Sequence, residues 1–244
     1  MKLIMKHTSL ITLLTGLLGI CLWACGPEND ILRNQVPAVG ARVKFIHAVP
    51  GGPSVNIFAN DAKLNGAAVV YGGAFPVAEY SALTPGTVNL KVATPASGTT
   101  ASQPILSAPV TLEADKYYTI AAAGTPTAPA AVLINDDISL PDPSKAYFRV
   151  INLLTSGQTV DLAIGTGSPL LSAVASRTAS AFVAVDPVTS TSPYTFQVRI
   201  AGVATPLSIT NQTAGVGRKY TIFVRGTLGS AGVPVPAASV YLTR

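Results

Sequence analysis

The segment Arg42-Val43-Lys44-Phe45-Ile46-His47-Ala48 carries the pattern on which the predicted fold depends. Val43, Phe45 and His47 share one face, while the basic residues between them take the other face, so the side chains alternate with a period of two. This period is typical of a β-strand with one buried face. A turn is predicted directly afterwards, at Pro50-Gly51-Gly52-Pro53.

Similar stretches recur along the chain, separated by turn formers such as Asn65-Gly66 and Pro85-Gly86. After the first strand, we expect strands near residues 54–59, 74–83, 87–92, 104–112, 116–123 and 130–134. Pro76 interrupts the stretch 74–83, which predicts an edge strand or a bulge there. About seven strands with turn signals every 8–12 residues indicate an immunoglobulin-like sandwich.

This pattern then repeats. Residues 43–47 align with 148–152, and 88–92 align with 196–200. The insertions fall in predicted loops while the inward apolar positions persist, which indicates two copies of one unit. We therefore predict an all-β chain of two tandem immunoglobulin-like antiparallel β-sandwich domains. Their predicted bounds are 41–138 and 146–244, with a polar, proline-bearing linker at 139–145.

A tyrosine recurs at matching positions of the two copies, Tyr118 and Tyr220, each soon after a predicted turn. Buried tyrosines normally find a hydrogen-bond partner for the hydroxyl group. We expect both rings to be buried, with each hydroxyl bonded to a neighbouring loop.

The N-terminus carries a short apolar run, from Leu10 to Leu22, behind Lys2 and Lys6. A positive start followed by a run too short to span a membrane is typical of a signal peptide, here residues 1–24. The run ends in Leu22-Trp23-Ala24-Cys25, which resembles the lipobox of bacterial lipoproteins. We expect acyl chains such as palmitate on Cys25 and a tether over 25–40. The alternative is a plain secreted protein with a free N-terminal cysteine.

Composition favours a β-rich chain, with only 11% charged residues, 21 glycines and 19 prolines. The net charge of +5 falls to +3 once Lys2 and Lys6 are removed with the signal peptide. The remaining basic residues are scattered, with Arg218-Lys219 the only adjacent pair, so no nucleic-acid surface is expected. Both cysteines lie within residues 1–25, which excludes a disulfide in the predicted domains.

Few residues suggest chemistry. His47 is the only histidine after the leader, and its counterpart in the second copy is Asn152, which cannot act as a base. We therefore expect a hydrogen bonder at a strand end rather than a catalytic residue. Asp136, Asp137 and Asp142 could supply oxygen ligands to calcium, or form a solvated hinge. We predict no catalytic, cofactor-binding or metal-binding residue, and the sequence implies no cofactor.

Several motifs of the first copy resemble domain-of-unknown-function family 4397 (DUF4397). They are Ala41-Arg42-Val43, His47-Ala48, the segments 53–58, 83–87 and 112–119, and Asn135-Asp136-Asp137. The resemblance covers 41–137 well and 146–244 more loosely, because the second copy has Asn152 and lacks the acidic closing motif. It implies a bacterial envelope or secreted protein, and it implies no particular activity.

The expected function is that of a non-catalytic, lipid-anchored envelope protein with a structural or adhesive role, at the outer membrane of a Gram-negative cell. Its partners would be the membrane, through the anchor, and an envelope protein or glycan, with no nucleic acid. The alternative is a ligand-binding accessory module for envelope polysaccharide or a protein. A hydrolase is the third reading.

Overall fold

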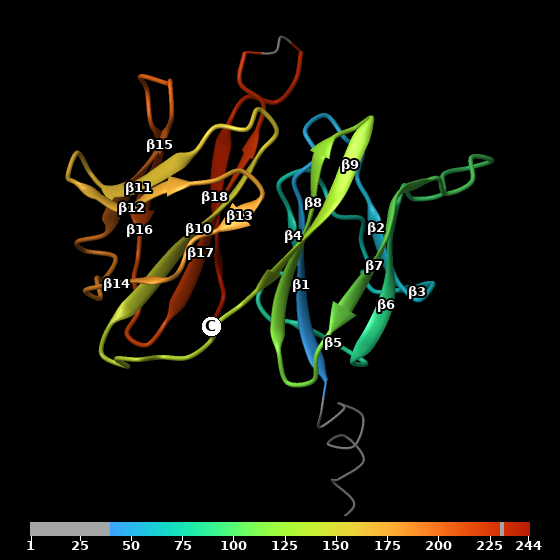
Figure 1. Cartoon of the computed structure of the whole chain (residues 1–244), viewed down its shortest axis with the longest axis horizontal. Helices are drawn as coiled ribbons and strands as arrows, with labels where there is room; N and C mark the ends of the chain where they lie inside the picture. Colours follow the sequence, from blue (N-terminus) through green and yellow to red (C-terminus); the bar gives the residue numbers. More distant parts are fainter. Residues whose placement is uncertain (1–39, 230–231) are drawn as a thin grey trace, which may run out of the picture. The chain divides into compact units, whose positions relative to one another are not determined.

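The computed structural model describes residues 40–229 and 232–244 (Figure 1). The predicted signal peptide at 1–24, the lipidation at Cys25 and the tether before Gly40 lie outside these residues. Every regular element in the described residues is a β-strand, which confirms the all-β prediction. None of these residues forms a helix long and apolar enough to cross a membrane.

The first half, from β1 to β9, consists of two sheets. One has the order β4-β1-β8-β9, with β5 also paired to β1, and the other has the order β3-β2-β6-β7. The strands of the first sheet are β1 (Ala41–His47), β4 (Ala74–Phe75), β5 (Ser81–Leu83), β8 (Tyr117–Thr125) and β9 (Ala128–Asn135). Those of the second are β2 (Asn56–Ala59), β3 (Ala62–Lys63), β6 (Gly86–Ala93) and β7 (Pro104–Leu112).

The second half, from β10 to β18, repeats this arrangement. Its sheets have the orders β13-β10-β17-β18, with β14 also paired to β10, and β12-β11-β15-β16. The first contains β10 (Ala146–Leu154), β13 (Thr178–Ala179), β14 (Val183–Val185), β17 (Lys219–Gly226) and β18 (Ala237–Leu242). The second contains β11 (Val160–Ile164), β12 (Pro169–Val174), β15 (Tyr194–Ile200) and β16 (Leu207–Gln212). The predicted repeat of one sandwich is confirmed, whereas the exact domain bounds stay a prediction.

One strand pair in each half is parallel, β1 with β8 and β10 with β17. The sheets are therefore mixed, whereas we predicted antiparallel sheets. Parallel neighbours require a long crossover between them. The chain provides one, because all strands of the second sheet of each half come between the two parallel strands in the sequence (Figure 1).

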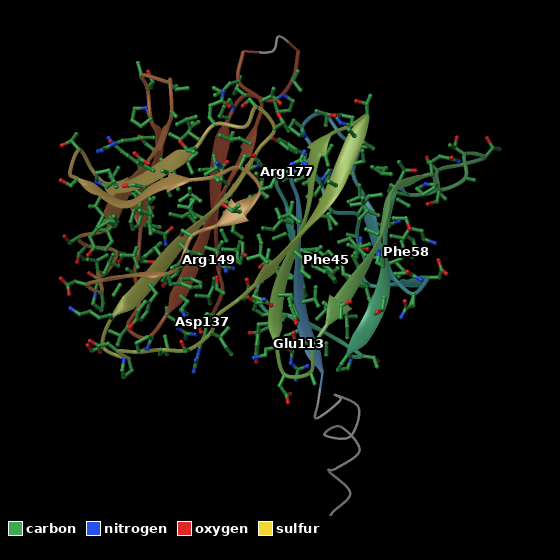
Figure 2. All side chains as sticks on the ribbon, viewed as in Figure 1. Phe45, Phe58, Glu113, Asp137, Arg149 and Arg177 are labelled. Atoms are coloured by element: carbon green, nitrogen blue, oxygen red, sulfur yellow. The ribbon has the colours of Figure 1, made fainter. Side chains whose placement is uncertain are left out.

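Each half has its own apolar core between its two sheets. In the first half, Phe45 of β1, labelled in Figure 2, belongs to the same buried cluster as Leu90 of β6 and Ile120 of β8. In the second, Phe148 of β10 packs against Phe196 of β15, with ring centroids 4.5 Å apart. The inward position of Phe45 is the one that the alternation predicted.

A third core lies on the opposite face of β1 and β10 and joins the two halves. Its buried members come from both halves: Ile46, Ala48, Ala121, Ala123, Ile134, Ile151, Leu153, Phe223 and Tyr241. We call this contact the seam. The two halves accordingly belong to one compact unit. The face of β1 opposite its own core is thus covered by protein rather than by water, and Lys44 on that face is fully buried.

Candidate functional site

The most unusual feature of the molecule is a cluster of charged side chains buried in the seam. Arg149 of β10 forms an ion pair with Asp136, which follows β9, and the two side chains are 2% and 0% exposed. The Arg149 Nε atom also donates to Thr221 Oγ1 at 2.9 Å, and Nη1 donates to the Asn135 carbonyl at 3.3 Å. Arg149 thus fastens the second half to the end of the first.

The carboxylate of Asp136 accepts two further hydrogen bonds at its Oδ2 atom, from Tyr80 OH at 2.6 Å and from Thr119 Oγ1 at 2.7 Å. Thr119 lies 2.8 Å from the hydroxyl of Tyr241, a residue of the second half. Burial, and then the nearby Asp136 carboxylate, raise the pKa values of Tyr80 and Tyr241. Both phenols therefore stay neutral and act as hydrogen-bonding groups.

Strand register shows that this cluster breaks the symmetry of the repeat. Asn135 pairs with Tyr118, and Leu242 pairs with Tyr220, so Asp136 and Thr243 occupy equivalent positions. In the second half, Thr221 Oγ1 bonds Thr243 Oγ1 at 2.6 Å, where the first half has Thr119 and Asp136. The seam therefore holds a carboxylate on one side only.

Two lysines complete the cluster. Lys44, the counterpart of Arg149, donates to the carbonyls of Pro76 at 3.0 Å and Val77 at 3.3 Å, and its Nζ atom lies 5.2 Å from the ring centres of Tyr80 and Tyr241. Burial lowers the pKa of Lys44 to about 8, although Asp136 and Glu79 oppose the change.

Lys219 at the start of β17 donates to the carbonyls of Asp137 at 2.6 Å and Ser139 at 2.7 Å. Its Nζ atom lies 4.2 Å from the ring centre of Phe182, the same ring that covers the guanidinium of Arg149. Burial lowers the pKa of Lys219, and the nearby Asp137 opposes this. These contacts fix the connecting segment after β9 onto the second half.

Two hollows open beside the charged cluster. The larger, of about 660 Å³, is lined by Glu113, Lys116, Asp137, Arg244 and their neighbours. The smaller, of about 270 Å³, lies against Arg149, Phe182 and Lys219. Figure 2 shows Glu113 at the turn before β8 and Asp137 on the segment after β9. A hollow with both acidic and basic walls can hold a polar molecule.

His47 lies at the other end of β1, away from this cluster. Its Nε2 atom is 2.9 Å from the Pro53 carbonyl, six residues further on. Asn152 makes the same contact in the second half, because its Nδ2 atom donates to the Gln158 carbonyl at 2.8 Å. The predicted role as a strand-end hydrogen bonder is confirmed. Burial lowers the pKa of His47, so the ring is neutral at pH 7.

The three aspartates considered for calcium do not converge. Asp136 is occupied by Arg149, Asp137 accepts from the Ser139 backbone at 2.8 Å, and Asp142 accepts from the Ser144 backbone at 2.9 Å. Within residues 40–229 and 232–244, no three His, Cys, Asp or Glu side chains are grouped so that they could hold a metal ion. The alternative of a solvated hinge is wrong for Asp136, which is buried.

Comparison with known proteins gives one family. The family described as "Domain of unknown function (DUF4397)" matches residues 41–163, which include the whole first half and the first two strands of the second up to Ala163. No curated protein matches the chain. One similar solved structure is that of a candidate cell adhesion protein from Bacteroides uniformis ATCC 8492. It has 11% identity and a TM-score of 0.25, over 83% of this chain and 96% of the other.

Proposed function

Because this chain belongs to the DUF4397 family, whose description names no function, we propose a role from the chemistry of its own residues. The protein is a non-catalytic component of the cell envelope, anchored by lipid at Cys25, with a structural or adhesive role. It is exported by the leader 1–24 and held at the outer membrane of a Gram-negative cell.

One observation carries the non-catalytic part of this proposal. The buried ionisable side chains join parts of the same chain: Arg149 bonds Asp136, Lys219 bonds two carbonyls of the connecting segment, and His47 lies against the Pro53 carbonyl. A catalytic acid or base must reach a substrate proton. Groups engaged in this way serve to join strands and loops.

The anchor is tested by growing cells with labelled palmitate and separating their membranes. The leader contains a second cysteine, Cys21, which provides a matched control. We expect label and membrane retention for the natural chain and for Cys21→Ala, and loss of both for Cys25→Ala. An unacylated N-terminus in the mass spectrum of the natural chain would refute the anchor.

The location and role need separate tests. Protease treatment of intact cells should remove the protein if it faces outward, and adhesion of cells lacking it should fall. If the protein is protected and adhesion is unchanged, the role is structural and faces the periplasm.

A ligand-binding accessory module is the second candidate, and the hollow of about 660 Å³ favours it. Retention of the protein on peptidoglycan or on a glycan array, lost in the variant Lys116→Ala, would support this reading. A structural protein should be retained by neither.

The hydrolase reading is tested at His47. Since Asn152 fills the same structural place, His47→Asn should keep the fold while removing any base. Activity across hydrolase substrates that disappears in His47→Asn would overturn the non-catalytic proposal.

A further inference from the structure

The larger hollow beside the charged cluster lies at the end of the molecule where the chain enters β1, which we call the anchor end. Gly40 directly precedes β1, and its carbonyl accepts a hydrogen bond from Asp115 N at 3.2 Å. Asp115 is itself one of the residues that line the hollow of about 660 Å³. Figure 1 shows the start of β1 beside the turn that precedes β8. The folded part of the chain therefore begins next to the hollow.

The length of the tether limits the distance between the hollow and the proposed lipid. Cys25 lies fifteen residues before Gly40. Fifteen residues span at most about 50 Å when the chain is fully extended. A lipid on Cys25 would therefore keep the anchor end within this distance of the membrane surface, so that the hollow can reach the headgroups.

The two sides of the hollow are held in place by hydrogen bonds. The turn before β8 is fixed by Glu113 N, which donates to Tyr118 OH at 3.0 Å. The segment after β9 is fixed by Asp136, whose backbone N–H donates to the Tyr117 carbonyl at 2.7 Å and whose side chain pairs with Arg149. A hollow with fixed walls binds a ligand without the cost of ordering the walls first.

The walls carry both signs of charge. The charged residues at the surface of the hollow are Glu113, Asp115, Lys116, Asp137 and Arg244. Asp137 already lies 3.5 Å from Lys219. In the part of the chain that the structure describes, Glu113, Asp115 and Lys116 take part in no ion pair. A ligand with one positive and one negative group meets a partner for each, whereas a ligand of one sign also meets like charges.

We propose that this hollow binds the headgroup of a membrane phospholipid that carries a primary ammonium and a phosphate group. Glu113 and Asp115 accept hydrogen bonds from the ammonium, while Lys116 and Arg244 donate to the phosphate. The Arg244 guanidinium is already fixed by donating to the Ile138 carbonyl, and it has further N–H groups for this contact. The inference rests on the lipid anchor proposed above, which brings the hollow to the membrane.

Such a contact is weak by itself. Exposed ion pairs each contribute little, so the hollow binds a soluble headgroup with low affinity. An anchored protein needs no more, because the tether holds the hollow at a high local concentration of lipid. The contact then adds to the attachment that the acyl chains provide, and it turns the anchor end towards the membrane.

The test is a titration of the natural protein in an uncharged detergent, followed by the NMR signals of its backbone amides. The probes are glycerophosphoethanolamine, glycerophosphocholine and glycerophosphoglycerol, which share the phosphate and differ in the group attached to it. We expect saturable shifts in residues 113–117 and 135–139, with the ethanolamine probe bound at least about threefold more tightly than the others. The choline group has no N–H to donate, and the glycerol group has no positive charge.

Two variants separate the contributions of the walls. Glu113→Gln should reduce the preference for the ethanolamine probe, because it removes a carboxylate that accepts from the ammonium. Lys116→Ala should weaken all three probes about two- to fivefold, because they share the phosphate. Glu79→Gln and Lys63→Ala are the matched controls. Both of these residues are exposed and do not line the hollow, so both variants should bind like the natural protein.

Three outcomes would overturn the proposal: no saturable shift with any probe, equal affinity for the three probes, or a preference for ethanolamine that Glu113→Gln leaves unchanged. Peptidoglycan fragments that shift the same amides while the probes do not would assign the hollow to a glycan instead. The soluble probes reach the hollow whether or not Cys25 is acylated. Failure here therefore leaves the anchor untouched, since palmitate labelling tests that separately.

Discussion

At the scale of single residues, the ion pair of Asp136 and Arg149 dominates the seam because neither side chain reaches water. Removing one partner of a buried pair leaves an uncompensated charge, which typically costs about 3–5 kcal/mol. We expect Asp136→Asn to lower the free energy of unfolding by about this amount in urea denaturation.

The double variant Asp136→Leu with Arg149→Met provides the matching control. Replacing both partners of a buried pair by apolar residues of similar volume is often close to neutral. The double variant should therefore be more stable than Asp136→Asn. If the single variant loses less than about 1 kcal/mol, the pair does not hold the seam.

Lys44 adds a dependence on pH. Burial lowers its pKa in the folded protein to about 8, whereas an unfolded lysine has a pKa of about 10.4. Between these values the unfolded chain binds more protons, so stability rises with pH. From pH 7 to 9.5, the unfolding free energy of the natural protein should gain about 2 kcal/mol relative to that of Lys44→Met.

This range ends below pH 10, where unfolded tyrosines begin to ionise. Lys116→Met, on an exposed turn, is the control and should show no comparable gain. A difference between the natural protein and Lys44→Met that stays constant with pH would contradict the assignment.

At the scale of elements, equivalent tyrosines near the start of β8 and β17 bond the turn that precedes each of these strands. Tyr118 OH accepts from Glu113 N at 3.0 Å, and Tyr220 OH accepts from Gly215 N at 3.0 Å, each five residues upstream. The predicted bond from each hydroxyl to a neighbouring loop is therefore confirmed. The ring of Tyr118 is buried as predicted, whereas the ring of Tyr220 is only partly buried.

We expect Tyr118→Phe and Tyr220→Phe each to lower the free energy of unfolding by about 1–2 kcal/mol, because a turn N–H loses its acceptor. Tyr71→Phe is the matched control, since the Tyr71 hydroxyl is buried without a hydrogen-bond partner. Thermal unfolding of the three variants checks this. Equal effects in all three would show that the turn bonds contribute nothing specific.

The strands themselves could be predicted closely because alternation encodes them directly. The stretch 104–112 matches β7, and Pro76 divides 74–83 into β4 and β5. The two-residue strand β3 was missed, since a pair of residues carries no period. The hydrogen-bonding role of His47 could be predicted from the repeat. The equivalent residue, Asn152, can form hydrogen bonds but cannot act as a base, so hydrogen bonding is the role that both residues can share.

The charged cluster could not be predicted in the same way. A lysine or arginine on alternate positions of a strand indicates a solvated face, and burial here comes from the packing of one copy on the other. A signal was present nonetheless: Ala121, Ile151 and Phe223 make the second face of their strands apolar as well. Strands covered on both faces have this composition.

At the scale of the whole molecule, the third core predicts that the two halves unfold together. It buries large apolar side chains from both halves, among them Ile46, Ile151 and Phe223. We expect a single calorimetric transition for the natural protein. Phe223→Ala, at a cost of about 3–5 kcal/mol, should weaken this coupling and separate the transition into two.

Phe148→Ala is a control of similar size within the core of the second half alone. It should lower the stability of that half without removing the contact between halves. Two transitions in the natural protein would mean that the seam is too weak to couple the halves.

The single carboxylate of the seam has a consequence for how this duplicated chain can change. Asp136 pairs with Arg149 across the seam, while the equivalent residue of the second half, Thr243, bonds Thr221 and supplies no carboxylate, so the two copies are no longer interchangeable in composition. Fusing two second copies would bury an arginine in each half with no acid to pair with it. Fusing two first copies would instead supply an acid for each lysine.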